Sequence, residues 1–135
     1  MIAFPIQSLM DEQACYDYLL AVLHPDGLHC PQGHRLSAEQ GSHDRHRAPI
    51  VDYRCKTCGA VFNVFTNTVW SKTRHSCATI VLILRGVAQG RPTAHLAREL
   101  RVDRAHLLEH RHEIQKLIEQ RFPPNPAERH SDGSR

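Results

Sequence analysis

The sequence has no long hydrophobic run. Its longest mainly apolar stretch, residues 78–84, has seven residues, whereas a helix that crosses a bilayer needs about 20. The N-terminus, Met-Ile-Ala-Phe-Pro, has no basic segment and no cleavage pattern behind an apolar stretch, so we expect no secretory signal. The expected location is cytoplasmic, with no membrane partner.

The cysteine count is odd, which argues against a disulfide framework. Five cysteines, including one CxxC pair, and eleven histidines among 135 residues favour metal binding in a reducing compartment. Neither an HExxH motif nor an HxE motif paired with PCxxC occurs, which excludes zinc peptidases and zinc nucleobase deaminases of those types. A chain this short forms one domain or two very small ones. A very small domain buries too little apolar surface to be stable alone and needs additional stabilisation, such as a bound metal ion.

Neither sign of charge dominates the chain. Seventeen basic and fourteen acidic residues give a net charge of +3, which permits a polyanionic partner without requiring one. The arginines are unevenly placed, because six of them fall within one stretch of about thirty residues: Arg85, Arg91, Arg98, Arg101, Arg104 and Arg111. This stretch is either a nucleic-acid-binding face or a solvated helical surface.

The hydrophobic pattern predicts an α+β fold. Spacings of three and four residues predict a helix over residues 9–23, opened by a capping box of Ser8 and Asp11 and ended by the turn at residues 25–27. The apolar stripe expected on that helix is Ala14, Tyr18, Leu19, Val22 and Leu23. Short β-type segments predict hairpins within residues 26–75, with a mobile polar loop at 37–49.

Three further helices are expected over residues 76–121. Ser76 is expected to cap a strongly apolar helix, Thr93 a short helix that ends at Leu100, and Asp103 a long helix that runs to about Arg121. The long helix is expected to bury Leu107, Ile114, Leu117 and Ile118. Residues 122–135 are polar and rich in proline, and we expect a disordered tail there. The expected domains are therefore residues 1–25, 26–75, 76–121 and the tail 122–135.

Two short motifs predict one structural zinc site. Cys55 and Cys58 form a CxxC pair followed by glycine, the usual way for one hairpin tip to present two thiolates to zinc. Cys30 opens a second turn that lacks another cysteine, and His34 is the natural substitute because an imidazole reaches farther than a thiol. His29, His43 and His46 compete with His34 for this position, and a redox CxxC is the alternative for the pair. Two other cysteines, Cys15 and Cys77, are expected in the core.

Several segments together resemble the N-terminal region of bacterial insertion-sequence transposases. The resemblance covers roughly residues 10–120 and rests on Tyr18-Leu19-Leu20, residues 24–27, Cys30-Pro31, residues 53–58, Phe62-Asn63-Val64 and residues 66–70. In that family a short helix leads into a zinc ribbon, a helix-turn-helix follows, and a catalytic domain of the DDE type comes last. The resemblance therefore implies a ribbon of small β-hairpins between an N-terminal helix and a C-terminal three-helix unit.

The sequence departs from the family pattern at three places within that region. His34 replaces the second ribbon cysteine, Asn67 replaces a glycine, and Arg101 stands where a glycine usually ends the first helix of the motif. No room is left after residue 121 for the three carboxylates and α/β scaffold that a DDE site requires. We therefore expect a DNA-binding protein that is not an enzyme, an orphan module or a regulator.

A helix-turn-helix assigns roles to the exposed residues of the last two helices. The start of the last helix enters the major groove, so Arg104, Ala105 and His106 would face base edges, with His110 nearer the buried side. The expected phosphate contacts are Arg91, His95, Arg98 and Arg111. The expected partner is double-stranded DNA, with a transposase catalytic subunit or a second copy of the chain as further partners.

Three other interpretations stay open. In the first, the ribbon stiffens a helical platform and the chain is a protein–protein interaction module whose basic face meets an acidic partner. In the second, His106 and His110, four residues apart on one helix, belong to a metal sensor. A plain αα-corner would pack the same apolar residues without binding DNA at all.

Overall fold

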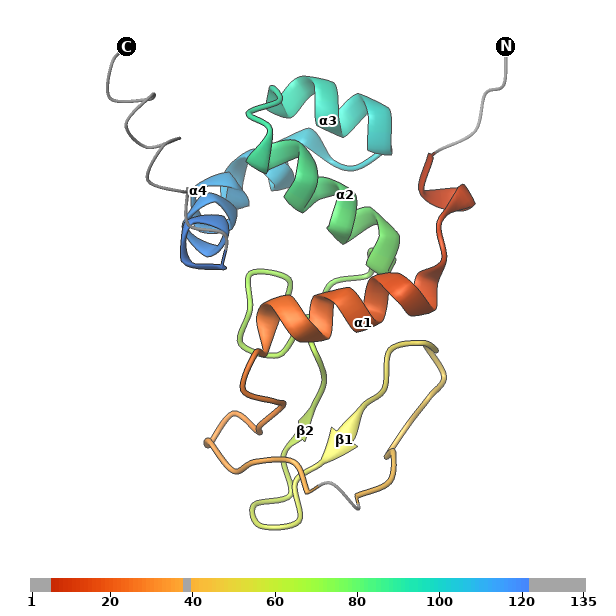
Figure 1. The fold of residues 1–135 in the computed structure, drawn as a ribbon, viewed down its shortest axis with the longest axis vertical. Helices are drawn as coiled ribbons and strands as arrows, with labels where there is room; N and C mark the ends of the chain where they lie inside the picture. Colours follow the sequence, from red (N-terminus) through yellow and green to blue (C-terminus); the bar gives the residue numbers. More distant parts are fainter. Residues whose placement is uncertain (1–5, 38–39, 122–135) are drawn as a thin grey trace. The chain divides into compact units, whose positions relative to one another are not determined.

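The computed structural model describes residues 6–37 and 40–121 and has an α+β fold, as predicted (Figure 1). The described elements, in chain order, are a 3-10 turn at Ile6–Leu9, α1 (Glu12–Leu23), β1 (Tyr53–Arg54), β2 (Val61–Phe62), α2 (Cys77–Ala88), α3 (Thr93–Leu100) and α4 (Arg104–Arg121). The chain divides into two compact units, Met1–Leu82 and Ile83–Arg135, and the division falls within α2. The predicted disordered tail lies outside the described residues.

Helix α1 begins later than expected, because Asp11 caps it alone. The Asp11 carboxylate accepts hydrogen bonds from the backbone N–H groups of Gln13 and Ala14 at 3.0 and 3.3 Å, which satisfies two of the free donors at the helix start. Residues 9–11 are therefore outside the helix, and the capping box with Ser8 was wrong. The helix ends at the expected turn, where Gly27 has φ 94° and donates to the carbonyl of His24.

The buried face of α1 is also rotated from the expected one. Leu19, Val22 and Leu23 are buried as predicted, but Cys15 and Tyr16 join them, whereas Tyr18 is 45% exposed and Ala14 faces solvent. The two stripes share the C-terminal half of the helix, so spacing alone could not separate them.

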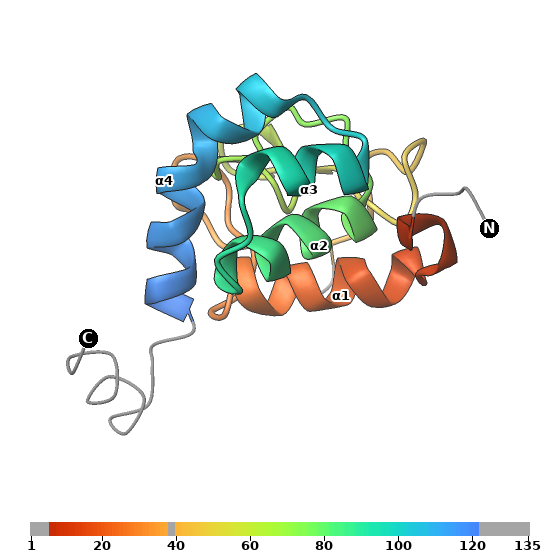
Figure 2. The same ribbon diagram turned by 90° about the horizontal axis from the view of Figure 1, so that it is seen from above.

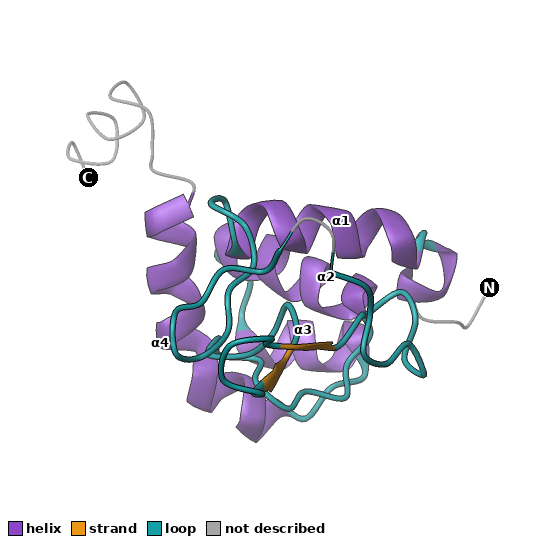
Figure 3. Cartoon of the chain, turned by 90° about the horizontal axis from the view of Figure 1, so that it is seen from below, coloured by secondary structure: helices purple, strands orange, loops and turns teal. Residues whose placement is uncertain are grey.

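The first unit contains a two-stranded antiparallel sheet, drawn in orange in Figure 3. β1 pairs with β2 so that Tyr53 faces Phe62 and Arg54 faces Val61. Residues 28–36 fold back on themselves in a similar way, with a bridge between His29 and Arg35. The tips of these two folded segments carry the four residues expected to bind zinc.

The polar loop at residues 37–49 is partly tied to the rest of the first unit. Asp44 forms an isolated antiparallel bridge with Asp52, and His43 also donates a backbone hydrogen bond to the carbonyl of Asp52 at 2.8 Å. The mobility expected for residues 38 and 39 concerns positions outside the described residues. The remainder consists mainly of hydrogen-bonded turns rather than of a repeating structure.

Two side chains that are far apart in the sequence, Ser76 and Glu12, cap the start of helix α2. The Ser76 hydroxyl accepts from the N–H of Thr79 at 3.2 Å, as the sequence predicted. The Glu12 carboxylate, from the first turn of α1, accepts from the N–H groups of Cys77 and Ala78 at 3.0 and 2.9 Å. A negative charge at this end also complements the helix dipole.

The second unit contains the end of α2 together with α3 and α4, and Figure 2 shows α3 beside α2 and the short connection that leads into α4. Gly86 of α2 lies directly against the Leu96 side chain of α3. The buried side chains of this unit include Leu96, Ala97, Leu100, Leu107 and Ile114. Leu117 and Ile118, expected in the core, are only half-buried.

The connection that leads into α3 and the one between α3 and α4 are stabilised in different ways. Pro92, not Thr93, is the N-cap of α3 and makes no side-chain cap bond, so the cap expected from Thr93 was wrong. The Thr93 hydroxyl instead accepts from Arg111 of α4 at 3.1 Å. At the other end of α3, Arg101 has the left-handed conformation (φ 57°, ψ 46°) that usually ends a helix at glycine. Asp103 caps α4 as expected, accepting from the N–H of His106 at 3.1 Å.

Candidate metal centre

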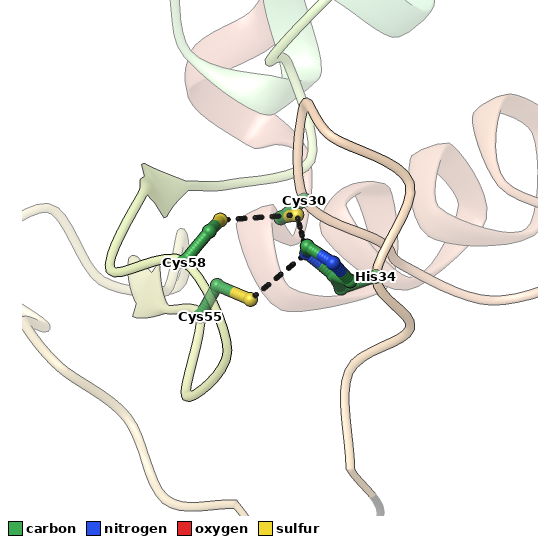
Figure 4. A group of neighbouring side chains, drawn as sticks. All are labelled: Cys30, His34, Cys55 and Cys58. Atoms are coloured by element: carbon green, nitrogen blue, oxygen red, sulfur yellow. Dashed lines mark hydrogen bonds between the residues drawn. The ribbon is translucent and has the colours of Figure 1, made fainter.

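Four side chains from the two folded tips converge on one point in the first unit (Figure 4). The donor atoms of Cys30, His34, Cys55 and Cys58 all lie within 4.8 Å of one another. Cys30 Sγ lies 3.6 Å from Cys58 Sγ and 3.2 Å from His34 Nδ1, and Cys55 Sγ lies 3.7 Å from the same nitrogen. Sequence spacing alone placed these four residues together correctly.

The donor separations fit one tetrahedral ion. With Zn–S bonds of about 2.3 Å and Zn–N bonds of about 2.0 Å, tetrahedral geometry separates two sulfurs by about 3.8 Å and a sulfur from a nitrogen by about 3.5 Å. The observed sulfur–sulfur distance of 3.6 Å is about 0.2 Å below the ideal value, and the sulfur–nitrogen distances of 3.2 and 3.7 Å lie on either side of theirs. Three thiolates and one imidazole are also a common donor set of structural zinc sites.

Each tip is a tight turn closed by a glycine with positive φ. In the first, the N–H of Gly33 (φ 92°) donates to the carbonyl of Cys30, and the N–H of Cys30 donates to the carbonyl of His34; both bonds are 2.8 Å. In the second, Gly59 (φ 77°) donates to the carbonyl of Cys55 at 2.9 Å. These turns set the directions in which the four donors point, toward a common centre.

The thiols of the second tip differ in acidity. The backbone N–H of Cys58, followed by that of Thr57, lowers the pKa of Cys55 to about 6, because these donors stabilise the thiolate. The Ala60 N–H also lowers the pKa of Cys58, but desolvation and the neighbouring thiols of Cys30 and Cys55 outweigh it, and the net shift is upward. A thiolate at Cys55 is the form that a metal ion needs.

The centre lies on a small apolar base. Cys30, Cys55 and Phe62 are buried together, with Leu28, Leu36 and Tyr53 packed against them. The rings of Tyr53 and Phe62 lie 6.0 Å apart across the paired strands. Cys58 is exposed and His34 is half-buried, so the centre lies at the surface of the unit and not inside its hydrophobic core.

The competing histidines lie elsewhere. The His29 ring packs edge-on against His24 with centroids 6.3 Å apart. His46 belongs to a separate exposed group, in which its Nδ1 lies 2.9 Å from a carboxylate oxygen of Asp44. That group, completed by the half-buried Asp52, also brings three donors within 4.8 Å, and Asp52 accepts a hydrogen bond from the Asn63 amide at 2.9 Å. The choice of His34 over its rivals therefore agrees with the geometry.

Cys15 and Cys77 are buried, as expected for core cysteines. Burial, together with the neighbouring Glu12 carboxylate, raises the pKa of Cys77 to about 12 and also raises that of Cys15. Both thiols therefore stay protonated and unreactive, and neither belongs to a group of three or more potential metal donors among the described residues.

The residues predicted to contact DNA all lie in the second unit, on α3, α4 or the segment just before α3. Most are exposed: Arg91, His95, Arg98, Arg104, Ala105 and His106. His110 and Arg111 are half-buried. Arg91 and His95 approach the Glu99 carboxylate at 3.6 and 3.7 Å, so part of the expected phosphate-binding charge is already balanced.

The outer face of α4 carries two exposed residues, Leu108 and His112, that were not predicted as functional from the sequence. Leu108 is 60% exposed on α4, and His112 is exposed one turn further along. Plotting α4 with 3.6 residues per turn around the buried Leu107 and Ile114 would have placed Leu108 and His112 on the outer face. Glu12 was missed because nothing in the sequence links it to residues 77 and 78.

Comparison with protein-family models, with curated proteins and with solved structures gives no match. Among the described residues, no helix combines the length and the hydrophobicity needed to pass through a membrane.

Proposed function

We propose that the chain is a zinc-stabilised DNA-binding protein, in which a zinc ribbon supports a helix-turn-helix. The ribbon comprises the two folded tips, and one zinc ion is bound by Cys30, His34, Cys55 and Cys58. The support for zinc is the convergence of four donors at tetrahedral spacing. In this proposal the ion stabilises the first unit and performs no chemistry.

The helix-turn-helix consists of α3, a turn at residues 101–103, and α4. The observation that carries this part is the start of α4, where Arg104, Ala105 and His106 are all exposed just after a turn that is only three residues long. Behind them, Leu107 is buried with Leu96 and Leu100 among the core side chains. A helix held by its inner face, with a basic and polar outer face at its N-terminal end, has the features of a helix that enters the major groove.

The outer face of α4 offers chemically distinct groups for base contacts. Arg104 can donate to guanine, and the exposed Leu108 can contact a thymine methyl group. Arg98 and Arg111 are the proposed phosphate contacts, and the bond from Arg111 to the Thr93 hydroxyl holds its guanidinium at the start of α3. Arg91 and His95 act in the same way once phosphate competes with Glu99.

The resemblance to transposase N-terminal regions supports the same proposal. By this proposal, the chain derives from or belongs to such a protein and acts by sequence recognition without catalysis. It would bind double-stranded DNA alone, together with a second copy of the chain, or together with a transposase catalytic subunit.

A titration of DNA binding across salt concentrations tests the proposal. Binding to a duplex should weaken as salt rises, with a log–log slope of about −0.9 for each phosphate neutralised. Arg104→Ala should weaken binding by about 1–3 kcal/mol and relax sequence preference. Arg121→Ala is the matched control, because it removes the same charge from the far end of α4. Equal affinity, preference and salt slope for wild type and Arg104→Ala would contradict this docking.

The exposed Leu108 also favours one other function, a protein–protein interaction module. A leucine that is 60% exposed on a helix is a suitable anchor for a partner groove. The two functions differ in the salt response of DNA binding, since contacts with a protein partner release no counterions from DNA. Weak DNA binding that is independent of salt, with strong loss of a protein contact in Leu108→Ala, would favour the module.

A further inference from the structure

The two histidines in the first half of α4 form a close pair. His106 Nε2 and His110 Nε2 lie 3.1 Å apart, and the two rings meet edge to face with centroids 4.5 Å apart. The residues are four positions apart, so they occupy neighbouring turns on one side of the helix. His106 is exposed and His110 is half-buried, which leaves the pair open to solvent.

We propose that His106 and His110 chelate a divalent transition-metal ion at a second site, separate from the four-donor centre. An ion bound at about 2.0–2.1 Å from each Nε2 atom would see the two nitrogens at an angle of about 98°, given their separation of 3.1 Å. This angle lies between the about 90° of octahedral or square-planar sites and the about 109° of tetrahedral sites. The pair therefore fits the bite of one ion without movement of the helix.

The present contact between the rings is a hydrogen bond, in which one Nε2–H faces the lone pair of the other nitrogen. Metal binding needs lone pairs on both Nε2 atoms, so the donating ring moves its proton to Nδ1, and no net proton is released from a neutral pair. Rotation about the side-chain torsions turns the lone pairs toward the ion, which the exposed His106 ring can do more freely than the half-buried His110 ring.

The proposed site has two protein donors and keeps its other positions for water. Among residues 6–37 and 40–121, no further histidine, cysteine or acidic side chain joins this pair as a third donor. The Asp103 carboxylate is occupied as the cap of α4. Two imidazole donors without thiolates suit nickel, copper and zinc ions, with affinity expected to rise from nickel to copper. The ion would exchange readily, unlike one held at the four-donor centre.

If the proposed function is correct, an ion bound to this pair would compete with DNA. His106 lies on the face of α4 that is proposed to meet base edges, so a bound ion and its waters would occupy the same space as DNA. Metal binding and DNA binding would then be mutually exclusive at this face, and each would lower the apparent affinity of the other.

A nickel titration of the zinc-loaded chain, purified without a histidine tag, tests the site itself. Binding is followed by calorimetry and by paramagnetic broadening of the histidine ring signals in NMR spectra. We expect preferential broadening of His106 and His110, and at least a tenfold loss of affinity in His106→Gln and in His110→Gln. His112→Gln, which changes an exposed histidine on the same helix, and His46→Gln, from the Asp44 group, are the matched controls and should keep this affinity.

The outcomes separate the two proposals. Equal nickel affinity in wild type and in the His106→Gln/His110→Gln double variant, with unchanged helix content by circular dichroism, would overturn the metal site. If nickel binds as expected but the chain binds no duplex DNA, the site stands and the proposed function fails. If both bind, nickel should weaken DNA binding of the wild type and leave that of His110→Gln unaffected.

Discussion

Gly86 of α2 and Leu96 of α3 lie so close that a Cβ atom on Gly86 would come within 2.2 Å of Leu96 Cδ2. Leu96 is only 1% exposed, so its side chain has little room to move away. The glycine is therefore a requirement of helix packing, although it lies inside a helix, where glycine costs about 1 kcal/mol relative to alanine.

We expect Gly86→Ala to destabilise the second unit by about 1–3 kcal/mol, because overpacking outweighs the gain in helix propensity. Urea unfolding followed by circular dichroism measures this change. Leu96→Ala alone should cost about 2–5 kcal/mol, and the double variant should be no less stable than Leu96→Ala. A Gly86→Ala variant more stable than wild type would show that α2 and α3 do not approach each other this closely.

Glu12→Gln should destabilise the first unit by about 1–2 kcal/mol. The carboxylate accepts from two N–H groups at the start of α2, whereas the amide can accept only one of them and turns its own NH₂ group toward the other. Thermal unfolding compared with Asp17→Asn, an exposed charge removal on the same helix, isolates the effect. Equal midpoints for the two variants would exclude Glu12 as a cap.

Arg101→Gly should stabilise the second unit by about 0.5–1 kcal/mol. Arg101 adopts φ 57°, a conformation that costs a side-chain-bearing residue about 1–2 kcal/mol and glycine almost nothing, part of which is offset by the entropy of glycine in the unfolded chain. Arg101→Ala keeps the strain and should give no gain. If both variants have the same stability, the loss of the arginine side chain, not the backbone, determines the result.

Stability should fall with rising pH between about 10 and 12 because of Tyr16. Burial, and next the nearby Tyr53, raise the pKa of Tyr16 from 10.0 to about 12. Below pH 10 both folded and unfolded chains hold the neutral phenol; above it only the unfolded chain ionises readily, which favours unfolding. The loss from this group is about 1 kcal/mol by pH 11.

The comparison of Tyr16→Phe with wild type measures that contribution. The variant should have a smaller loss of unfolding free energy between pH 9 and 11, whatever its stability at neutral pH. Tyr18→Phe, which changes an exposed ring on the same helix, should follow the wild-type curve. Parallel curves for Tyr16→Phe and wild type would mean that Tyr16 ionises equally in both states.

The features that were predictable from the sequence are those set by short-range chemistry. The spacing of Cys55 and Cys58 predicts a metal-binding turn, and the capping residues Ser76 and Asp103 predict the starts of α2 and α4. Asn67 adopts φ 62°, in keeping with the tolerance of asparagine for positive φ.

The features that could not be predicted depend on contacts between distant positions. Glu12 caps a helix 65 residues further along the chain, and Thr93 accepts from Arg111 rather than capping its own helix. The face of α1 was ambiguous because two apolar stripes share its last turns, and packing against the rest of the first unit selects the one with Tyr16. The helical spacing of His106 and His110 was visible, but the 3.1 Å separation of their nitrogens was not.

The central claim is that the two folded tips share one zinc ion, and native mass spectrometry of the chain produced in zinc-supplemented medium tests it most directly. We predict one zinc per chain for wild type, and loss of zinc together with folded structure for His34→Ala and for Cys55→Ser. A wild-type chain that is folded without zinc, or a Cys55→Ser/Cys58→Ser variant that retains one zinc ion, would contradict the account.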